Sequence, residues 1–368
     1  MMLDRPQHLS LVADPARALT NPVWRATSET RLSRIARIVG LAAVAGLILL
    51  PAIAPRTLLQ DLFFVFTILT LAQLWNVLAG WGGLVSVGQQ AFVGLGAYVL
   101  FAAIGLGSLD PVSSIAIAAV ATAVIAALIG PLLFRLEGPY FAIGSWVAAE
   151  SLRLVCAQFK SLGGGTGMSL QSSAYSSLPG LKSTQNLFGV RPAIARDIVL
   201  YWIALAIAVV VMLAIYRFVK SRHGLALAAS RDNDRAARSV GVRTDRIRFA
   251  LWVAVAGMTG AIGALAYLQK ARISPDAAFS VTDWTAYVLF VVIIGGVRTI
   301  EGPVVGVMIL WGLIFYLSQY GSLYLLVLGV IAILVMLFMP MGIWGAASHR
   351  WNVQLFPTQR RLFRDASL

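Results

Sequence analysis

Long apolar runs set the strongest limit on how this chain can fold. Residues 58–78, 112–134 and 198–219 each approach or exceed the ~20 residues that an α-helix needs to cross a bilayer. Only 12% of the 368 residues are charged, against about 25% in an average soluble chain. A transmembrane β-barrel would show alternating apolar and polar residues instead. The sequence therefore predicts an all-α polytopic membrane protein.

We expect about ten transmembrane helices, of which the eighth is short or broken. The expected spans are 35–54, 58–78, 83–106, 112–134, 140–159, 198–219, 249–268, 284–297, 303–317 and 323–339. They divide the chain into an N-terminal tail (1–34), a transmembrane domain (35–345) and a C-terminal tail (346–368). The longest loops lie at about 160–197 and about 218–248.

The lysines and arginines predict the orientation, because cytoplasmic loops carry an excess of them. With ten spans and both termini in the cytoplasm, the 218–248 loop and its flanks become the main cytoplasmic basic region. Its basic residues are Arg217, Lys220, Arg222, Arg231, Arg235, Arg238, Arg243, Arg246 and Arg248. The opposite, periplasmic side receives fewer: Arg56, Lys160, Lys182, Arg191, Arg196, Lys270 and Arg272. This distribution explains the net charge of +14, and no motif for binding nucleic acid accompanies it.

The sequence offers no catalytic or metal-binding set. A single cysteine, Cys156, excludes a disulfide framework, and the histidines His8, His223 and His349 lie far apart. No Gly-x-x-x-x-Gly-Lys-Ser/Thr phosphate loop occurs, and the glycine cluster at 163–167 lacks the lysine. We therefore expect neither enzymatic activity nor a cofactor bound by this chain.

The polar stretch RDNDRAARSVGVRTDRIRF (231–249) stands out between two apolar runs. Ser230 or Asp232 could cap a short helix that contains Ala236 and Ala237. Gly241 would end it, because glycine readily adopts left-handed backbone angles. A short helix with alanines on one face and arginines on the other fits either a surface of anionic lipid headgroups or a protein partner.

The pattern Ala236-Ala237-x-x-x-Gly241 resembles the cytoplasmic Glu-Ala-Ala-x-x-x-Gly signature of ABC importer permeases. Arg235 stands where that signature has glutamate, and the later Ile-x-x-Pro is not evident. Other segments resemble, in order, the branched-chain amino acid ABC permeases of the LivM type. They are GWGGLVSVGQQAFVGLGAYV (80–99), FRLEGPYFAIGSWVAAESLRLV (134–155), GGGTGMSL (163–170) and IIGGVRTIEGPVVGV (293–307). The resemblance covers roughly residues 40–345.

The resemblance implies a permease subunit of an importer in the bacterial inner membrane. Such a subunit forms the path for amino acids, branched-chain ones in this family. Its implied partners are P-loop ATPase subunits that use ATP, a second homologous permease and a periplasmic substrate-binding protein. The residues that the resemblance assigns to ATPase coupling are Arg231, Asp232, Asn233, Arg235, Ala236, Ala237 and Gly241.

Polar residues within the spans are candidates for the substrate path. Ser86, Gln89 and Gln90 lie in the glycine-rich third span, where glycine permits close packing or local unwinding. Tyr140 and Ser145 begin the fifth span. Tight helix packing is the simpler explanation for all of these residues.

Glu150 is the ionisable candidate for the path. Arg153 follows it by three residues, which places both on one helix face. The pair is either a structural ion pair or part of the path, because ionisable groups at membrane depth are costly.

Small residues gather at Ala256, Gly257, Gly260, Ala261 and Ala264, and a Gly-x-x-x-Gly joins Gly302 to Gly306. We expect both groups to form packing seams rather than to contact substrate.

Two other classes of membrane protein are possible from the residues. An ion-coupled secondary transporter of small polar solutes should carry acids at mid-membrane and often inverted repeats. Apart from Glu150 such acids are missing, and no repeat is evident. A membrane-embedded enzyme would need a catalytic set that the sequence does not show. The importer permease is the favoured prediction.

Overall fold

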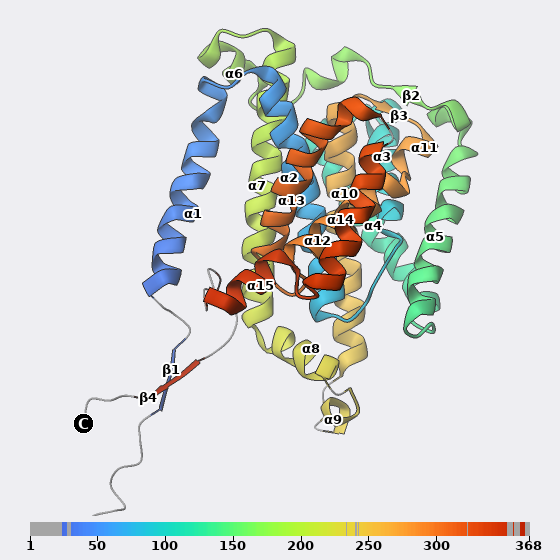
Figure 1. Cartoon of the computed structure of the whole chain (residues 1–368). Helices are drawn as coiled ribbons and strands as arrows, with labels where there is room; N and C mark the ends of the chain where they lie inside the picture. The colour runs from blue at the N-terminus through green and yellow to red at the C-terminus, as the bar shows by residue number, and fades with distance from the viewer. Residues whose placement is uncertain are drawn as a thin grey trace, which may run out of the picture.

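The computed structural model shows a bundle of α-helices and describes residues 24–27, 31–232, 234–239, 241, 243–321, 323–351, 356 and 361–364 (Figure 1). The helices of the first half are α1 (Arg31–Leu49), α2 (Arg56–Asn76), α3 (Gln89–Gly105), α4 (Pro111–Leu133), α5 (Pro139–Ala157), α6 (Leu181–Phe188) and α7 (Pro192–Lys220). Those of the second half are α8 (Arg222–Asp232), α9 (Asp234–Ser239), α10 (Thr244–Lys270), α11 (Pro275–Ala278), α12 (Tyr287–Gly295), α13 (Gly302–Leu317), α14 (Leu323–Phe338) and α15 (Gly342–Trp351).

Short elements complete the fold. Two π-helical turns, η3 (Val77–Trp81) and η7 (Thr282–Ala286), extend α2 and precede α12. The 3-10 turns are η2 (Leu50–Ala52), η4 (Lys160–Leu162), η5 (Gly164–Thr166), η6 (Ser172–Tyr175) and η8 (Ser318–Tyr320). Strand β1 (Trp24–Thr27) pairs antiparallel with β4 (Arg361–Arg364), and β2 (Met168–Ser169) pairs antiparallel with β3 (Arg272–Ile273).

Helix starts follow local sequence signals. Proline occupies the first position of α4, α5, α7 and α11, where its missing N–H costs nothing. Asp110 caps α4 by accepting a hydrogen bond from Ser113 N at 3.0 Å, and Ser274 caps α11 by accepting one from Ala277 N. These signals explain why the four helices begin at these positions.

The class of all-α membrane protein is confirmed. Among the described residues, six helical stretches are long and apolar enough to cross a membrane: Arg56–Trp81, Pro111–Leu133, Pro192–Lys220, Thr244–Lys270, Pro275–Gly295 and Leu323–Arg350. Ile38–Ala52, Gln89–Gly105 and Gly302–Leu317 are shorter apolar helices. The expected fifth span forms α5. Its apolar run is interrupted by Glu150 and Arg153. The number of ten spans stays a prediction.

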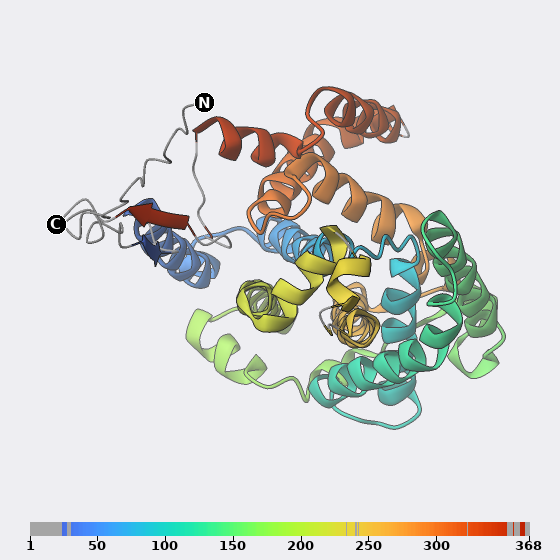
Figure 2. The ribbon, with the colours of Figure 1, turned by 90° about the horizontal axis from the view of Figure 1, so that it is seen from below.

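The bundle has two distinct ends, visible in Figure 1. Helices α6 and α11 and the β2–β3 pair lie at one end, which we call the α6 end. Helices α8 and α9 lie at the opposite end, which we call the α8 end. Seen from below in Figure 2, the yellow α8 crosses the α8 end beside the blue end of α2. The two longest loops of the chain therefore project from opposite ends.

Helix α10 lies at the centre of the bundle and packs against α3 and α4, while α7 packs on α2 and α12 on α13. Glycine makes the closest approaches possible. A Cβ atom on Gly96 of α3 would lie 1.9 Å from the carbonyl oxygen of Gly260 on α10. A Cβ atom on Gly306 of α13 would lie 2.0 Å from the carbonyl oxygen of Val291 on α12. The prediction that Gly260 and Gly306 belong to packing seams is confirmed.

Candidate substrate path and coupling surface

The junction between α2 and α3 is unwound, with Gly82, Ser86 and Gly88 buried and Gly83 and Val85 exposed. Helix α2 ends in the π-helical turn η3, and Gly82 N donates to Val77 O at 3.1 Å. Gly83 has a left-handed φ of +73°, and residues 82–88 form no helix before α3 begins at Gln89. Backbone groups at membrane depth must be paired within the protein. The structure meets this requirement with side chains from several helices.

Four of the predicted path residues lie together at this junction. Ser86, Gln89, Gln90 and Ser145 are all at most 5% exposed. Ser145 Oγ on α5 accepts a hydrogen bond from Val87 N at 3.0 Å, and Gln89 Nε2 donates to Leu71 O at 3.0 Å.

Two further residues hold the same junction. Trp75 Nε1 donates to Ser86 O at 2.7 Å. Thr285 Oγ1 accepts from Gln90 N at 3.3 Å and donates to Gln90 Oε1. Buried side chains of α2, α5 and η7 thus hold the α3 side of the junction, whereas Gly83 and Val85 within it are exposed. The role of the junction in transport stays a prediction.

The other two predicted path residues lie on the outward face of α5. Tyr140 is 70% exposed, and the Glu150 side chain is 49% exposed. The predicted pair of Glu150 and Arg153 is confirmed: Arg153 Nε donates to Glu150 Oε1 at 2.9 Å. Arg153 Nη1 also donates to Asp276 Oδ1 on α11 at 2.7 Å. Because α5 stands at the periphery in Figure 1, this ion-pair network faces the surroundings of the chain.

Two buried amides on α2 were not predicted from the sequence. Gln73 Nε2 donates to Ile300 O at 2.6 Å, and Asn76 Nδ2 donates to Thr299 O at 2.8 Å. Asn76 Oδ1 accepts from Arg298 N at 2.9 Å. Their spacing of three within the run LAQLWNVL is the signal that could have identified them, because it places both on one face of an apolar helix. They hold the 298–300 loop against α2.

The predicted coupling residues occupy α8, α9 and the turn that follows. Gly241 ends α9 as predicted, with a left-handed φ of +87° and a hydrogen bond from its N to Arg238 O at 3.0 Å. The sequence predicted Ser230 or Asp232 as the cap of the helix that contains Ala236 and Ala237. The choice of Ser230 is wrong, and Asp232 is the last residue of α8. Ser230 lies inside α8, where its hydroxyl donates to Leu227 O at 3.0 Å because the helix continues to Asp232.

The remaining coupling candidates divide between the surface and the interior. Ala237 is only 5% exposed and packs within the chain, whereas Arg238 and Ser239 are exposed. Arg231 Nη1 donates to Gly80 O at 2.6 Å. Arg235 and Ala236 belong to α9, and Asn233 lies outside the described residues.

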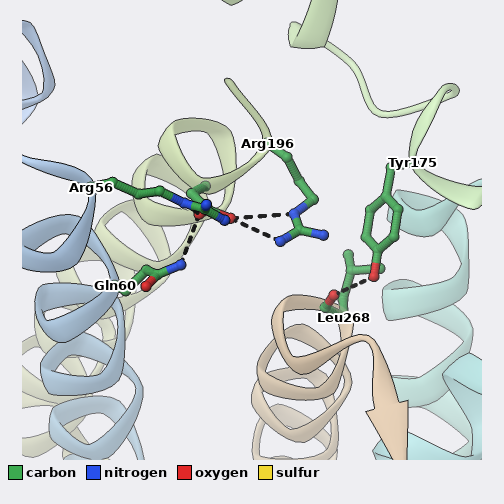
Figure 3. A network of polar contacts seen from close by, with 6 residues as sticks. Arg56, Gln60, Tyr175, Arg196 and Leu268 are labelled. Carbon is green, nitrogen blue, oxygen red and sulfur yellow. Dashed lines mark hydrogen bonds and ion pairs between the residues drawn. The ribbon is translucent and has the colours of Figure 1, made fainter. Parts of the chain in front are cut away.

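An ion-pair network at the α6 end was also missed by sequence reasoning (Figure 3). The Asp197 carboxylate on α7, 2% exposed, accepts from Arg56 Nε at 2.7 Å, from Gln60 Nε2 at 2.9 Å and from Arg196 Nη2 at 3.1 Å. The Arg196 guanidinium also lies 4.9 Å from the centre of the Tyr175 ring. The sequence signal that could have identified this network is Asp197 itself, an acid between Arg196 and the apolar run IVLYW. The network joins α2, α7 and the loop that contains η6.

Within the described part of the chain, no group of three or more His, Cys, Asp and Glu residues is placed to hold a metal ion. The polar groups of the junction and of the α5 face are amides, hydroxyls and one ion-pair network. The partly exposed pair of Glu150 and Arg153 could contact a charged or zwitterionic molecule, whereas the polar side chains at the junction are buried and bonded within the chain.

Comparison with known proteins gives one consistent result. A model of the family described as "Branched-chain amino acid transport system / permease component" matches residues 57–344. The chain is 27% identical over 347 residues to the high-affinity branched-chain amino acid transport system permease protein LivM of Escherichia coli (strain K12), a match that covers 83% of this chain and 80% of the relative. It is 26% identical over 280 residues to the protein of the same name from Salmonella typhimurium, covering 73% of this chain and 65% of that relative. No solved structure matches the chain.

Proposed function

Because this chain belongs to the permease family of branched-chain amino acid transport systems, we propose that it is the membrane-spanning subunit of an ABC importer. In this proposal it forms the translocation path for amino acids with apolar side chains. A periplasmic binding protein delivers them, and separate P-loop ATPase subunits drive transport. The chain lies in the bacterial inner membrane with both termini in the cytoplasm.

The observation that carries this proposal is the contact between the two predicted functional regions. The unwound 82–88 junction contains the predicted path residue Ser86, Gln89 and Gln90 follow it directly, and Ser145 bonds to Val87 within it. Helix α8 belongs to the predicted coupling loop. Arg231 of α8 bonds directly to Gly80, just before the junction. An importer needs such proximity, because events at the ATPase must reach the path.

The α5 face supports a second permease subunit as a partner. Glu150 and Arg153 form an ion pair on a surface that is otherwise apolar, with Ile143 and Val147 also exposed. Charged groups facing lipid are unfavourable, whereas they are tolerated beside a water-filled path or a protein partner. A path between two permeases would expose Glu150 and Arg153 to the ammonium and carboxylate of an amino acid.

The secondary-transporter alternative has weaker support. The buried acids among the described residues are Asp197 and Glu301. Asp197 lies at the α6 end within its arginine network, and Glu301 Oε1 accepts from Phe356 N at 2.7 Å. Neither arrangement resembles an ion-coupling acid at the centre of the membrane.

Glu150→Gln should lower amino-acid uptake at least tenfold while leaving the protein folded. A partly exposed ion pair contributes only ~0.2–1 kcal/mol to stability, so a large loss of uptake would report on transport. Uptake of radiolabelled leucine by cells that express the complete transporter is the measurement. Ser151→Ala, on the same helix, is the matched control. Unchanged uptake by the Glu150→Gln variant would contradict a role for Glu150 in the path and would show that its pair with Arg153 is structural.

Ser239→Trp should abolish uptake by blocking the ATPase from α9. Ser239 is exposed, so the bulky ring meets the partner rather than the interior. Ala237 is unsuitable for this test because it is buried within the chain. The measurement is the amount of ATPase subunit that copurifies with the chain, together with uptake.

Ser183→Trp, exposed on α6 at the opposite end, is the control and should retain the ATPase. A Ser239→Trp variant that binds the ATPase and transports normally would contradict the docking of the ATPase on α9.

A further inference from the structure

The end of α2 leaves backbone carbonyl groups without helical partners. The last four carbonyls of a helix lack N–H groups within the helix. Here Gly82 N bonds to Val77 O and Leu84 N bonds to Leu78 O, so the chain unwinds after η3. The Gly80 carbonyl accepts instead from Arg231 Nη1 at 2.6 Å. A guanidinium at the negative end of a helix dipole makes this a favourable charge-assisted bond.

Helix α8 is held to α10 at the same place. Ser230, 1% exposed, accepts from Arg248 Nη2 on α10 at 3.4 Å. The same Arg248 nitrogen lies 4.0 Å from the position that a Cβ atom on Gly83 would occupy. The side chains of α8 and α10 therefore meet at the first residues of the unwound junction.

Gly80 also lies against the 298–300 loop. A Cβ atom on Gly80 would lie 3.0 Å from Asn76 Oδ1 and 3.2 Å from Arg298 N. Asn76 bonds to this loop through both its amide nitrogen and its amide oxygen. The end of α2, the 298–300 loop and α8 thus contact one another at Gly80.

Only a few residues separate this point from the predicted path. Gly83, with its left-handed φ, lies between Gly80 and Ser86. Ser86 is anchored by its carbonyl to Trp75, and Val87 is anchored by its N–H to Ser145. A displacement of Gly80 would therefore act on a short segment that is fixed at its far side.

We propose that Arg231 is a positioning residue that ties the coupling loop to the substrate path. Its bond to Gly80 O fixes η3, which directly precedes the 82–88 junction, to α8, so that a movement of α8 and α9 displaces the start of the junction. Helix shifts of about 1–2 Å are the usual size of such movements at subunit interfaces. The transport role rests on the proposed function, whereas the bond itself can be tested on the chain alone.

The first test measures hydrogen exchange by mass spectrometry on the full chain in detergent. In Arg231→Ala, the amides of residues 82–88 should exchange at least tenfold faster than in the unchanged protein. Arg222→Ala, an exposed arginine of the same helix, is the control and should leave them unchanged. Arg231→Lys should restore part of the protection, because an ammonium can also donate to the carbonyl. Unchanged exchange in Arg231→Ala would overturn the proposal.

The second test uses the chain with its ATPase, permease and binding-protein partners in proteoliposomes. The complex that contains Arg231→Ala should take up at least tenfold less leucine per ATP hydrolysed than the unchanged complex. Normal uptake per ATP hydrolysed by this complex would overturn the transport role of Arg231. If the unchanged complex does not take up amino acid with ATP, the proposed function fails, and the exchange experiment still decides whether Arg231 holds the junction.

Discussion

Replacing Gly96 with leucine is expected to prevent the bundle from folding. A Cβ atom at this position would lie 1.9 Å from the Gly260 carbonyl oxygen and 2.6 Å from its Cα atom. Both are backbone atoms of the central helix α10, which cannot rotate aside as a side chain can. Overpacking a core costs ~1–3 kcal/mol where side chains can adjust, and we expect a larger cost here.

The measurement is the yield of monodisperse protein after detergent extraction, followed by size-exclusion chromatography. We expect at least a tenfold loss for Gly96→Leu. Gly329→Leu on α14 is the matched control, because a Cβ atom on Gly329 has no neighbour within 4 Å. A Gly96→Leu variant with normal yield and melting temperature would show that α3 and α10 do not pack as closely as described.

Replacing Asp197 with alanine is expected to destabilise the α6 end strongly. The buried carboxylate accepts hydrogen bonds from two arginines and Gln60, and its loss leaves these donors without their acceptor. Breaking a buried ion pair by removing one partner costs ~3–5 kcal/mol. The side chains of Arg56 and Arg196 are 46% and 21% exposed, so water can rehydrate them, which favours the lower end of this range.

A thermal melt in detergent measures this effect. The melting temperature of Asp197→Ala should fall by roughly 5 °C or more. Glu137→Ala, at an exposed loop position, should melt within a degree or so of the unchanged protein. An unchanged melting temperature in Asp197→Ala would mean that the network contributes nothing to stability.

The membrane-spanning architecture could be predicted because bilayers demand long apolar helices. The apolar runs identify the bundle helices, and glycine at 241 identifies the end of α9 from its backbone preference alone. The seams at Gly260 and Gly306 followed from small residues at helical spacing. These features depend on local chemistry, which a single sequence displays.

The features that were missed depend on contacts between distant segments. Gln73 and Asn76 hydrogen-bond to the 298–300 loop, which lies more than 200 residues away in the sequence. Arg231 was assigned to the coupling surface, and its contact with Gly80 follows only from the fold. Ser230 suited a helix cap by residue type, but α8 continues through it.

Contacts between helices also explain why some predicted path residues are buried at the junction and others are exposed on α5. Sequence spacing could place Ser145 and Glu150 on one helix, but it could not say which neighbours α5 meets. In the fold Ser145 contacts the 82–88 junction, and Glu150 faces outward with Arg153. Packing between helices therefore decides which of the polar residues a substrate could reach.

Copurification of the full chain in mild detergent, with mass spectrometry of its partners, tests the central claim most directly. The account predicts that a P-loop ATPase and a second, homologous permease accompany the chain. If the chain instead purifies alone and moves solute down an ion gradient, the importer proposal is contradicted.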